Sequence, residues 1–463
     1  MTRTDACSSM PVPHLRRVLT LRDLIFYGIV LIMPIAPVPL FGLAQKLSRG
    51  HAVTTILIAM VAMMLTAVSY GRMAALYPSA GSAYTYVGRE LNPHLGFVTG
   101  WTMFFDYLLI PLLNTIYGAL TVQRLVAPVL PHLPPKVLYV LLAALFSGTM
   151  TVLNLRGIRA TARANVVMLV VMCAVIGAFI LLAVQYLFTR QGWAGILSTQ
   201  PFYNPMTFDV RVITTATSFA ALTYIGFDGV TTLAEDAINP KRNVLLATVF
   251  VCLFTGLFGG LQIYLAQRVW PDWQTFSNLE TAFMDVCYRV GGLLLFHALA
   301  AILIVANLGS GLSGQVGAAR LLFSMGRDNV LPRRFFSHLD AKRSTPTYNI
   351  LLIGFLAFGG ALAMNYEFTA ECMNFGAFLG FMGVNLAAMR HFYFANRTPR
   401  RRRLLADALV PGLGFMFCLG IWLGLSAPAK IFGGGWLLAG IAYNAVKTRG
   451  FRQQPAMIDF SES

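Results

Sequence analysis

The sequence predicts an all-α membrane protein of about twelve transmembrane helices, in which two inverted repeats of five helices are followed by two C-terminal helices. Three observations predict this fold: the composition, the recurrence of long apolar runs, and the interruption of two of those runs. Of the 463 residues, 57% are hydrophobic and 11% are charged, whereas soluble domains carry roughly 25% charged residues. A soluble chain could not bury so many apolar segments.

Apolar runs of about 20 residues, enough to cross a bilayer, recur from Leu24 to Val446. They place a single transmembrane domain at 21–449, between cytoplasmic tails at 1–20 and 450–463. The first repeat is expected at 21–190, the second at 210–396 and the extra helices at 405–446. The predicted spans are 24–47, 52–76, 95–122, 136–154, 164–188, 212–237, 244–267, 292–320, 347–364, 369–389, 405–427 and 431–446.

The net charge of +17 is explained by topology. If the N-terminus is cytoplasmic, most of the 35 Lys and Arg residues fall in cytoplasmic loops, which is the positive-inside pattern. Both termini are therefore expected in the cytoplasm. The basic run Arg400–Arg403 is interpreted as a topological anchor that contacts anionic lipids, and no nucleic-acid partner is expected.

The remaining composition argues against several other classes of protein. The apolar segment after Arg22 is longer than a signal-peptide core, so no cleavable signal is expected. The cysteines show no metal spacing; pairing of Cys287 with Cys372 is left open. The seven histidines are isolated, and no nucleophile–base pair is evident, so an enzyme is not expected. No repeated filter sequence indicates a channel.

Two spans are interrupted at mid-membrane. The first contains LIMPIAPVPLFG, whose prolines 34, 37 and 39 remove backbone donors and should break the helix. In the sixth, Gly226 and Gly229 bracket Asp228. Broken helices at membrane depth are tolerated where they line a cavity, and corresponding breaks in two inverted repeats indicate a substrate site at the midplane. The alternative for the first span is a proline-kinked helix without a site.

Acidic residues inside the spans indicate a site for a cation. Burying an acid in the membrane costs roughly 2.5–3.5 kcal/mol on insertion scales, so such residues are functional candidates. Asp106, Asp228 and Glu235 have no deep Lys or Arg near them in the sequence. For Asp106 the alternative is a hydrogen bond within the scaffold, and for Glu235 it is exposure to water or pairing with Lys241 and Arg242.

Further candidates surround these acids. The break in the first span exposes backbone at Met33, Pro34, Ile35 and Ala36, where amides could cradle an anion; the prolines argue against an ordinary α-amino acid. Tyr107, Tyr224 and Phe227 could enclose an ammonium group by cation–π attraction, or could simply pack. Ser310 and Ser313 could help coordinate an ion, whereas the small residues around them could instead serve close helix packing.

Four stretches resemble the amino acid–polyamine–organocation transporters, and within them the bacterial putrescine importers. They are YPSAGSAYTYVGRELNPHLGFVTGWTMFFDYLLIP, GFDGVTTLAEDAINPKRNV, ANLGSGLSGQVGAARLLFSMGRDNVLP and NFGAFLGFMGVNL, in this order. The resemblance covers about Leu19 to Tyr443. It matches Tyr107 to a substrate-binding tyrosine, and Asp228 and Glu235 to acids of the importers. The sequence departs from the family pattern at MPIAPVP and lacks a buried lysine in the fifth span.

The resemblance implies a LeuT-like fold and a secondary active transporter of the bacterial inner membrane. It would import a small amine such as putrescine by alternating access, as a monomer or homodimer. Proton symport is expected, with sodium as the alternative coupling ion and no cofactor. A permease for neutral or cationic amino acids, or an exchanger, is the alternative function. Glu235, Ser310 and Ser313 are the candidates for coupling or gating.

Overall fold

A computed structural model describes residues 18–78, 82–156, 162–234, 236–327, 331–340, 345–395 and 403–455. The elements in this part of the chain are helical, apart from one isolated bridge between Leu19 and Ala237. The main helices are α1 Leu21–Ile32, α2 Phe41–Leu47, α3 Ala52–Leu76, α4 Ser82–Glu90, α5 Pro93–Val126, α6 Pro135–Leu155, α7 Ala162–Gln191, α8 Trp193–Ile196, α9 Val210–Ala220, α10 Pro240–Val269, α11 Ala282–Arg327, α12 Arg333–Phe336, α13 Thr347–Ala363, α14 Tyr366–Met389, α15 Val410–Leu423 and α16 Ala427–Lys447. The predicted all-helical class is confirmed.

The number of membrane spans follows from helix length and hydropathy. Nine helical segments among the described residues are long and apolar enough to cross a membrane. Three other predicted spans do not meet this criterion. The first is broken between α1 and α2, α13 has 17 residues, and α16 has 21 residues but a lower hydropathy. The total of twelve therefore remains a prediction.

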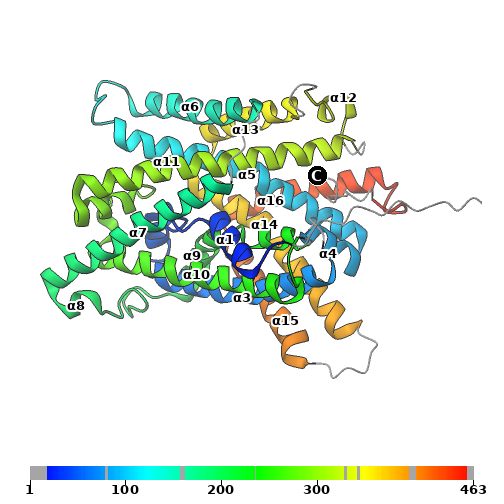
Figure 1. Ribbon diagram of the computed structural model, residues 1–463, viewed down its shortest axis with the longest axis horizontal. Helices are drawn as coiled ribbons and strands as arrows, with labels where there is room; N and C mark the ends of the chain where they lie inside the picture. Colours follow the sequence, from blue (N-terminus) through cyan, green and yellow to red (C-terminus); the bar gives the residue numbers. More distant parts are fainter. Residues whose placement is uncertain are drawn as a thin grey trace, which may run out of the picture.

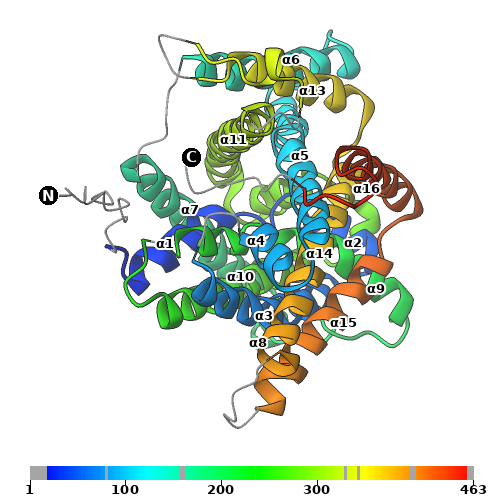
Figure 2. The ribbon, with the colours of Figure 1, turned by 90° about the vertical axis from the view of Figure 1, so that its right-hand side faces the viewer.

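The long helices run side by side and form layers (Figures 1 and 2). Helices α6 and α13 pair along one edge of the molecule, over α5 and α11. On the other side of α5, α3 and α10 pack against each other, and α14 lies against both α5 and α3. Apolar side chains on the outer helices, such as Leu145, Leu181 and Phe355, are exposed. This arrangement suits a lipid environment, where outward apolar surface carries no penalty.

The beginning of the first span and the end of the sixth are joined at one end of the bundle. The backbone amide of Leu19 donates to the Asp236 carbonyl at 2.9 Å, and the Ile238 amide donates to the Leu19 carbonyl at 2.8 Å. Thr20 then starts α1 with reciprocal hydrogen bonds to Asp23, a capping box that satisfies free amides of the first turn. The two interrupted spans thus share an anchored end.

The cysteines settle one expectation from the sequence. Cys287 on α11 and Cys372 on α14 are both buried free thiols, so the pairing left open by the sequence is not made. Each behaves as a small apolar side chain within the helical core.

Candidate functional site

The first span breaks where its prolines occur. Helix α1 ends at Ile32, and Met33 then adopts a positive φ of 65°. Residues 34–40 form successive turns before α2 begins at Phe41. Because prolines cannot donate a backbone hydrogen bond, a continuous helix cannot pass through residues 34–39. The predicted interruption is confirmed.

The sixth span breaks at a glycine. Helix α9 ends at Ala220 and continues as a short 3₁₀ turn, Ala221–Tyr224. Gly226 then has a φ of 110°, and a second 3₁₀ segment, Phe227–Leu233, follows. L-residues with a side chain rarely adopt this φ, whereas glycine does so readily. The second predicted interruption is therefore confirmed as well.

The two breaks lie against each other. A Cβ added to Gly226 would be 3.6 Å from the Leu31 carbonyl oxygen, and one added to Gly229 would be 2.6 Å from Leu31 Cδ1. The close approach of these glycines to the end of α1 brings the two irregular segments together. They meet at the wall of a single cavity.

This cavity has a volume of about 460 Å³, within the range of sites for small molecules. It is bounded by the breaks of spans one and six, one face of α5, the middle of α11 and part of α14. Residues of α5 line it at helical spacing, so they lie along one face. The α5 residues are Met103, Asp106, Tyr107, Ile110, Leu113, Asn114 and Tyr117.

The charge of the cavity wall has one sign. Asp106 and Asp228 both line it, and its described lining contains no Lys, Arg or His. Asp228 lies directly after the turn at Gly226, and its backbone carbonyl accepts a hydrogen bond from the Thr231 hydroxyl at 2.6 Å. Asp106 Oδ1 is buried and has no hydrogen-bond partner in the described part of the chain. An ammonium group could supply the donor and the charge that this oxygen lacks.

The two ends of the cavity differ in accessibility. At one end, Tyr107 and Ser313 are exposed. At the other, Tyr117 and Tyr366 are almost fully buried, with ring centroids 5.4 Å apart. The cavity is therefore open at its Tyr107 end and closed by a tyrosine pair at the opposite end.

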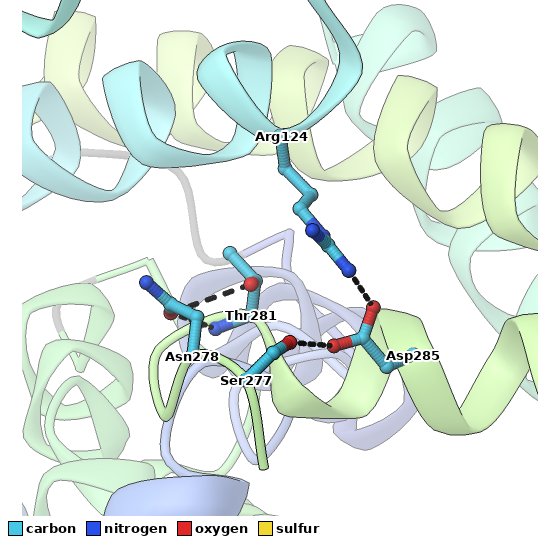
Figure 3. Close-up of polar contacts among 5 residues, drawn as sticks. All are labelled: Arg124, Ser277, Asn278, Thr281 and Asp285. Carbon is cyan, nitrogen blue, oxygen red and sulfur yellow. Dashed lines mark hydrogen bonds and ion pairs between the residues drawn. The ribbon is translucent and has the colours of Figure 1, made fainter. Parts of the chain in front are cut away.

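Beyond the closed end, an ion pair joins α5 to the beginning of α11 (Figure 3). Arg124 Nη2 lies 2.6 Å from Asp285 Oδ1, and Ser277 donates to the other oxygen of Asp285 at 3.2 Å. The preceding loop is closed by Thr281, whose backbone amide donates to Asn278 Oδ1 at 3.0 Å. Arg124 follows Tyr117 by seven residues, or about 10 Å of helix. The contact thus fixes the two helices outside the cavity.

The structure brings most of the predicted site residues to this cavity. Those that line it are Met33, Ile35, Ala36, Asp106, Tyr107, Asp228, Ser310 and Ser313. Glu235 lies outside the described residues. Pro34, Tyr224 and Phe227 do not line the cavity.

Each of these three residues is engaged elsewhere. The Pro34 carbonyl accepts a hydrogen bond from Gln262 Nε2 of α10 at 2.9 Å. The fully buried Tyr224 donates its hydroxyl to the Ile56 carbonyl at 2.8 Å. Phe227 is also fully buried, and its ring packs between aromatic rings of α3 and α14. The side chains of Tyr224 and Phe227 therefore pack into the core next to the break at Gly226 and do not line the cavity.

Several lining residues were not identified from the sequence. Polar or aromatic side chains of this kind are Tyr27, Tyr70, Asn114, Tyr117, Asn307 and Tyr366. A signal for two of them was present, since Asn114 and Tyr117 follow Asp106 by eight and eleven residues and so share its helix face.

The small residues of α11 have a packing role. A Cβ at Gly314 would lie 2.4 Å from Ile110 Cγ2, and one at Gly317 would lie 3.2 Å from the Tyr107 ring. These glycines let α5 and α11 approach closely, as small residues do between membrane helices. Ser310 and Ser313, on the same stretch, face the cavity. Within the described residues, no group of three or more His, Cys, Asp or Glu could hold a metal ion.

A comparison with known protein families identifies the class of protein to which this cavity belongs. The family model for amino acid permeases matches residues 24–459. The chain belongs to the amino acid permease family. It is therefore an integral membrane transporter and not an enzyme.

Three curated relatives show the range of this family. The low-affinity putrescine importer PlaP of Escherichia coli (strain K12) is 30% identical over 445 residues, covering 95% of each chain. The branched-chain amino acid permease BcaP of Lactococcus lactis is 25% identical, covering 93% of this chain and 94% of its own. The vacuolar cationic amino acid transporter 4 of Arabidopsis thaliana is 27% identical, covering 81% of this chain and 64% of its own. The resemblance to putrescine importers is confirmed as a similarity.

Proposed function

We propose that this permease imports a small amine such as putrescine, by proton symport with alternating access. The observation that carries the proposal is the sign of the cavity charge. Asp106 and Asp228 line a cavity whose described wall contains no basic side chain. Because an unpaired carboxylate at this depth is costly, a bound cation would relieve that cost.

The backbone at the breaks argues against a substrate with an α-carboxylate. In the first break, which is fully described, the prolines have no amide proton. The amides of Ala36 and Val38 donate to the carbonyls of Met33 and Ile35 at 3.0 Å. In the sixth break, the amides of Ile225 and Gly229 donate to the carbonyls of Leu222 and Gly226 at 3.2 and 3.1 Å. These amides are not available to a substrate carboxylate, which helix ends of broken spans would otherwise bind.

The accessibility of the cavity supports alternating access. By the positive-inside pattern, the N-terminal end of α5 is cytoplasmic, so the open end at Tyr107 faces the cytoplasm. The buried pair Tyr117 and Tyr366 then closes the outer side. In this proposal the structure represents an inward-facing state, and both termini lie in the cytoplasm. Proton coupling would use the carboxylates of Asp106 and Asp228, either of which can carry a proton.

Uptake into proteoliposomes tests the proposal. The purified protein would be assayed with radiolabelled putrescine, with proton and sodium gradients imposed separately. We expect uptake driven by the proton gradient, competition by short diamines, and loss of uptake in Asp228→Asn. Competition by amino acids but not by diamines would contradict the amine assignment, and uptake driven only by sodium would contradict proton coupling.

An amino acid permease is the second candidate. The similarity to the branched-chain amino acid permease BcaP favours it. So does the backbone amide of Ile35: among the described residues 33–40 it is the one amide N–H that donates to no backbone carbonyl, so it could bind a substrate carboxylate. The same competition assay separates the two candidates. An amino acid substrate would be displaced by other amino acids and left in place by diamines.

A further inference from the structure

Two asparagines on neighbouring helices line the cavity, away from the carboxylates. Asn114 lies on α5 and Asn307 on α11, and both line the cavity together with Ser310. Asn114 Nδ2 reaches Ser310 Oγ at 3.1 Å and so links the two helices. The three side chains form a polar group within a wall that is otherwise largely apolar.

The amide nitrogens of both asparagines donate to the backbone of their own helix. Asn114 Nδ2 also donates to the Ile110 carbonyl at 2.8 Å, and Asn307 Nδ2 donates to the Leu303 carbonyl at 2.6 Å. These bonds fix the orientation of each amide, because they hold the nitrogen against the helix backbone and leave the oxygen on the opposite side. Within the described part of the chain neither Oδ1 atom accepts a hydrogen bond, and both residues line the cavity. Two oriented acceptors are therefore available beside the Ser310 hydroxyl.

Acceptors without an added charge suit an ammonium group. A primary ammonium carries three donors and no acceptor, and the group offers three oxygens: two amide oxygens and one hydroxyl. Of the four N–H groups of the two amides, three already donate within the protein and one, on Asn307, is left. The acceptor oxygens thus outnumber the free amide donors, which favours a cationic hydrogen-bond donor over a carboxylate.

The position of the group sets the length of that ligand. Asn114 follows Asp106 by eight residues on α5, which is about 12 Å along the helix axis. A ligand that satisfies both ends must therefore be extended, with a cationic group at each end.

We propose that Asn114, Asn307 and Ser310 form a second, uncharged subsite that binds the far ammonium group of a diamine whose first ammonium lies at Asp106 and Asp228. This inference rests on the proposed amine transport and deepens it: the transporter distinguishes diamines from monoamines of the same chain length. The uncharged subsite contributes to selectivity without adding a third buried carboxylate.

The test compares putrescine with n-butylamine, which lacks the second ammonium. Both would be measured as competitors of radiolabelled putrescine in proteoliposomes. We expect wild-type protein to bind putrescine at least about tenfold more tightly, since hydrogen bonds to a charged group are worth roughly 1.5–3 kcal/mol. Asn114→Leu and Asn307→Leu should reduce this ratio toward one by weakening putrescine and leaving butylamine unchanged.

The matched substitutions Asn114→Asp and Asn307→Asp separate binding from packing. Aspartate keeps acceptor oxygens but loses the Nδ2 donor that each asparagine gives to its own helix. If the oxygens bind substrate, the aspartate variants keep or increase the preference for putrescine. If the residues matter only through their Nδ2 bonds, the aspartate variants lose uptake as the leucine variants do, and the inference is wrong.

Two other results would also overturn the inference, and they identify what has failed. If wild-type protein binds putrescine and butylamine equally, amine transport stands and the second subsite does not. If neither amine competes or is taken up, the proposed function fails together with the inference. Thermal unfolding in detergent accompanies each variant, and Ser310→Ala supplies a milder change should a leucine variant not fold.

Discussion

Trp101 of α5 lies directly against the backbone of Gly440 in α16. A Cβ added to Gly440 would be 2.3 Å from Trp101 Cδ1. The indole ring is stacked on Trp436, with centroids 5.0 Å apart, and its Nε1 donates to the Trp436 carbonyl at 3.0 Å. Trp101 is thus a docking residue for the last helix.

Gly440→Ala should weaken the attachment of α16. The added methyl group cannot be accommodated without moving Trp101, and such overpacking typically costs about 1–3 kcal/mol. We expect a lower melting temperature in detergent. Gly435→Ala, in the same helix, is the control, because a Cβ there has no neighbour within 4 Å and alanine favours helix formation. Equal melting temperatures for the two variants would contradict this interpretation of the contact.

The environment of Tyr77, just beyond the end of α3, leads us to expect a loss of stability at high pH. Its hydroxyl donates to Glu90 Oε1 at 2.5 Å, and His391 Nδ1 lies 2.7 Å from the same oxygen. Burial, followed by the hydrogen bond and the charge of Glu90, raises the pKa of Tyr77 to about 12. Since the unfolded value is about 10, the folded state favours the neutral phenol. Its stabilising contribution is complete below about pH 10 and is lost as the pH rises toward 12.

Tyr77→Phe should therefore flatten the decline in stability above pH 10. Thermal unfolding of the variant and of wild-type protein would be compared at pH 9, 10 and 11. Tyr288→Phe, at an exposed tyrosine near the start of α11, serves as the control and should keep the wild-type slope. The same slope in all three proteins would remove Tyr77 from the pH dependence.

The sequence predicts the breaks correctly because their causes are local. Prolines 34, 37 and 39 lack the amide proton that a helix needs, and Gly226 permits a φ that other residues avoid. The all-helical class follows equally from composition. These features require no knowledge of which helices are neighbours.

The direction of side chains around a break cannot be predicted in this way. Tyr224 and Phe227 flank Gly226, and both were expected in the cavity. A 3₁₀ turn followed by a residue at positive φ changes the helical spacing, so both rings point into the core instead. Asn114 and Asn307 illustrate a different limit: they lie 193 positions apart, and only the packing of α5 on α11 brings them to one cavity.

Replacing Asp106 is expected to have opposite effects on the stability of the protein and on substrate binding. Its Oδ1 has no hydrogen-bond partner in the described structure, and an unpaired buried charge is destabilising. Asp106→Asn removes the charge and keeps the shape. We expect a higher melting temperature together with at least a tenfold increase in the KM for putrescine, equivalent to about 1.4 kcal/mol.

Asp285→Asn is the matched control for Asp106→Asn. Asp285 lies outside the cavity and is paired with Arg124, whose side chain is 40% exposed. Loss of a partly exposed ion pair costs about 1 kcal/mol or less, so the melting temperature should fall slightly and the KM should not change. An unaltered KM in Asp106→Asn would exclude Asp106 from substrate binding.

Gly226 tests whether the break itself is required for transport. A Cβ at this position would have neighbours no closer than 3.6 Å, so space is available, but the φ of 110° is strained for alanine. Left-handed backbone costs an L-residue roughly 1–2 kcal/mol. We expect Gly226→Ala to shift the break toward a regular helix and to reduce the uptake rate. Gly148→Ala, in α6 with no neighbour within 4 Å of its Cβ, should retain normal uptake, because its backbone already suits alanine. If Gly226→Ala transports as well as Gly148→Ala, the unwound geometry of span six has no part in the transport cycle.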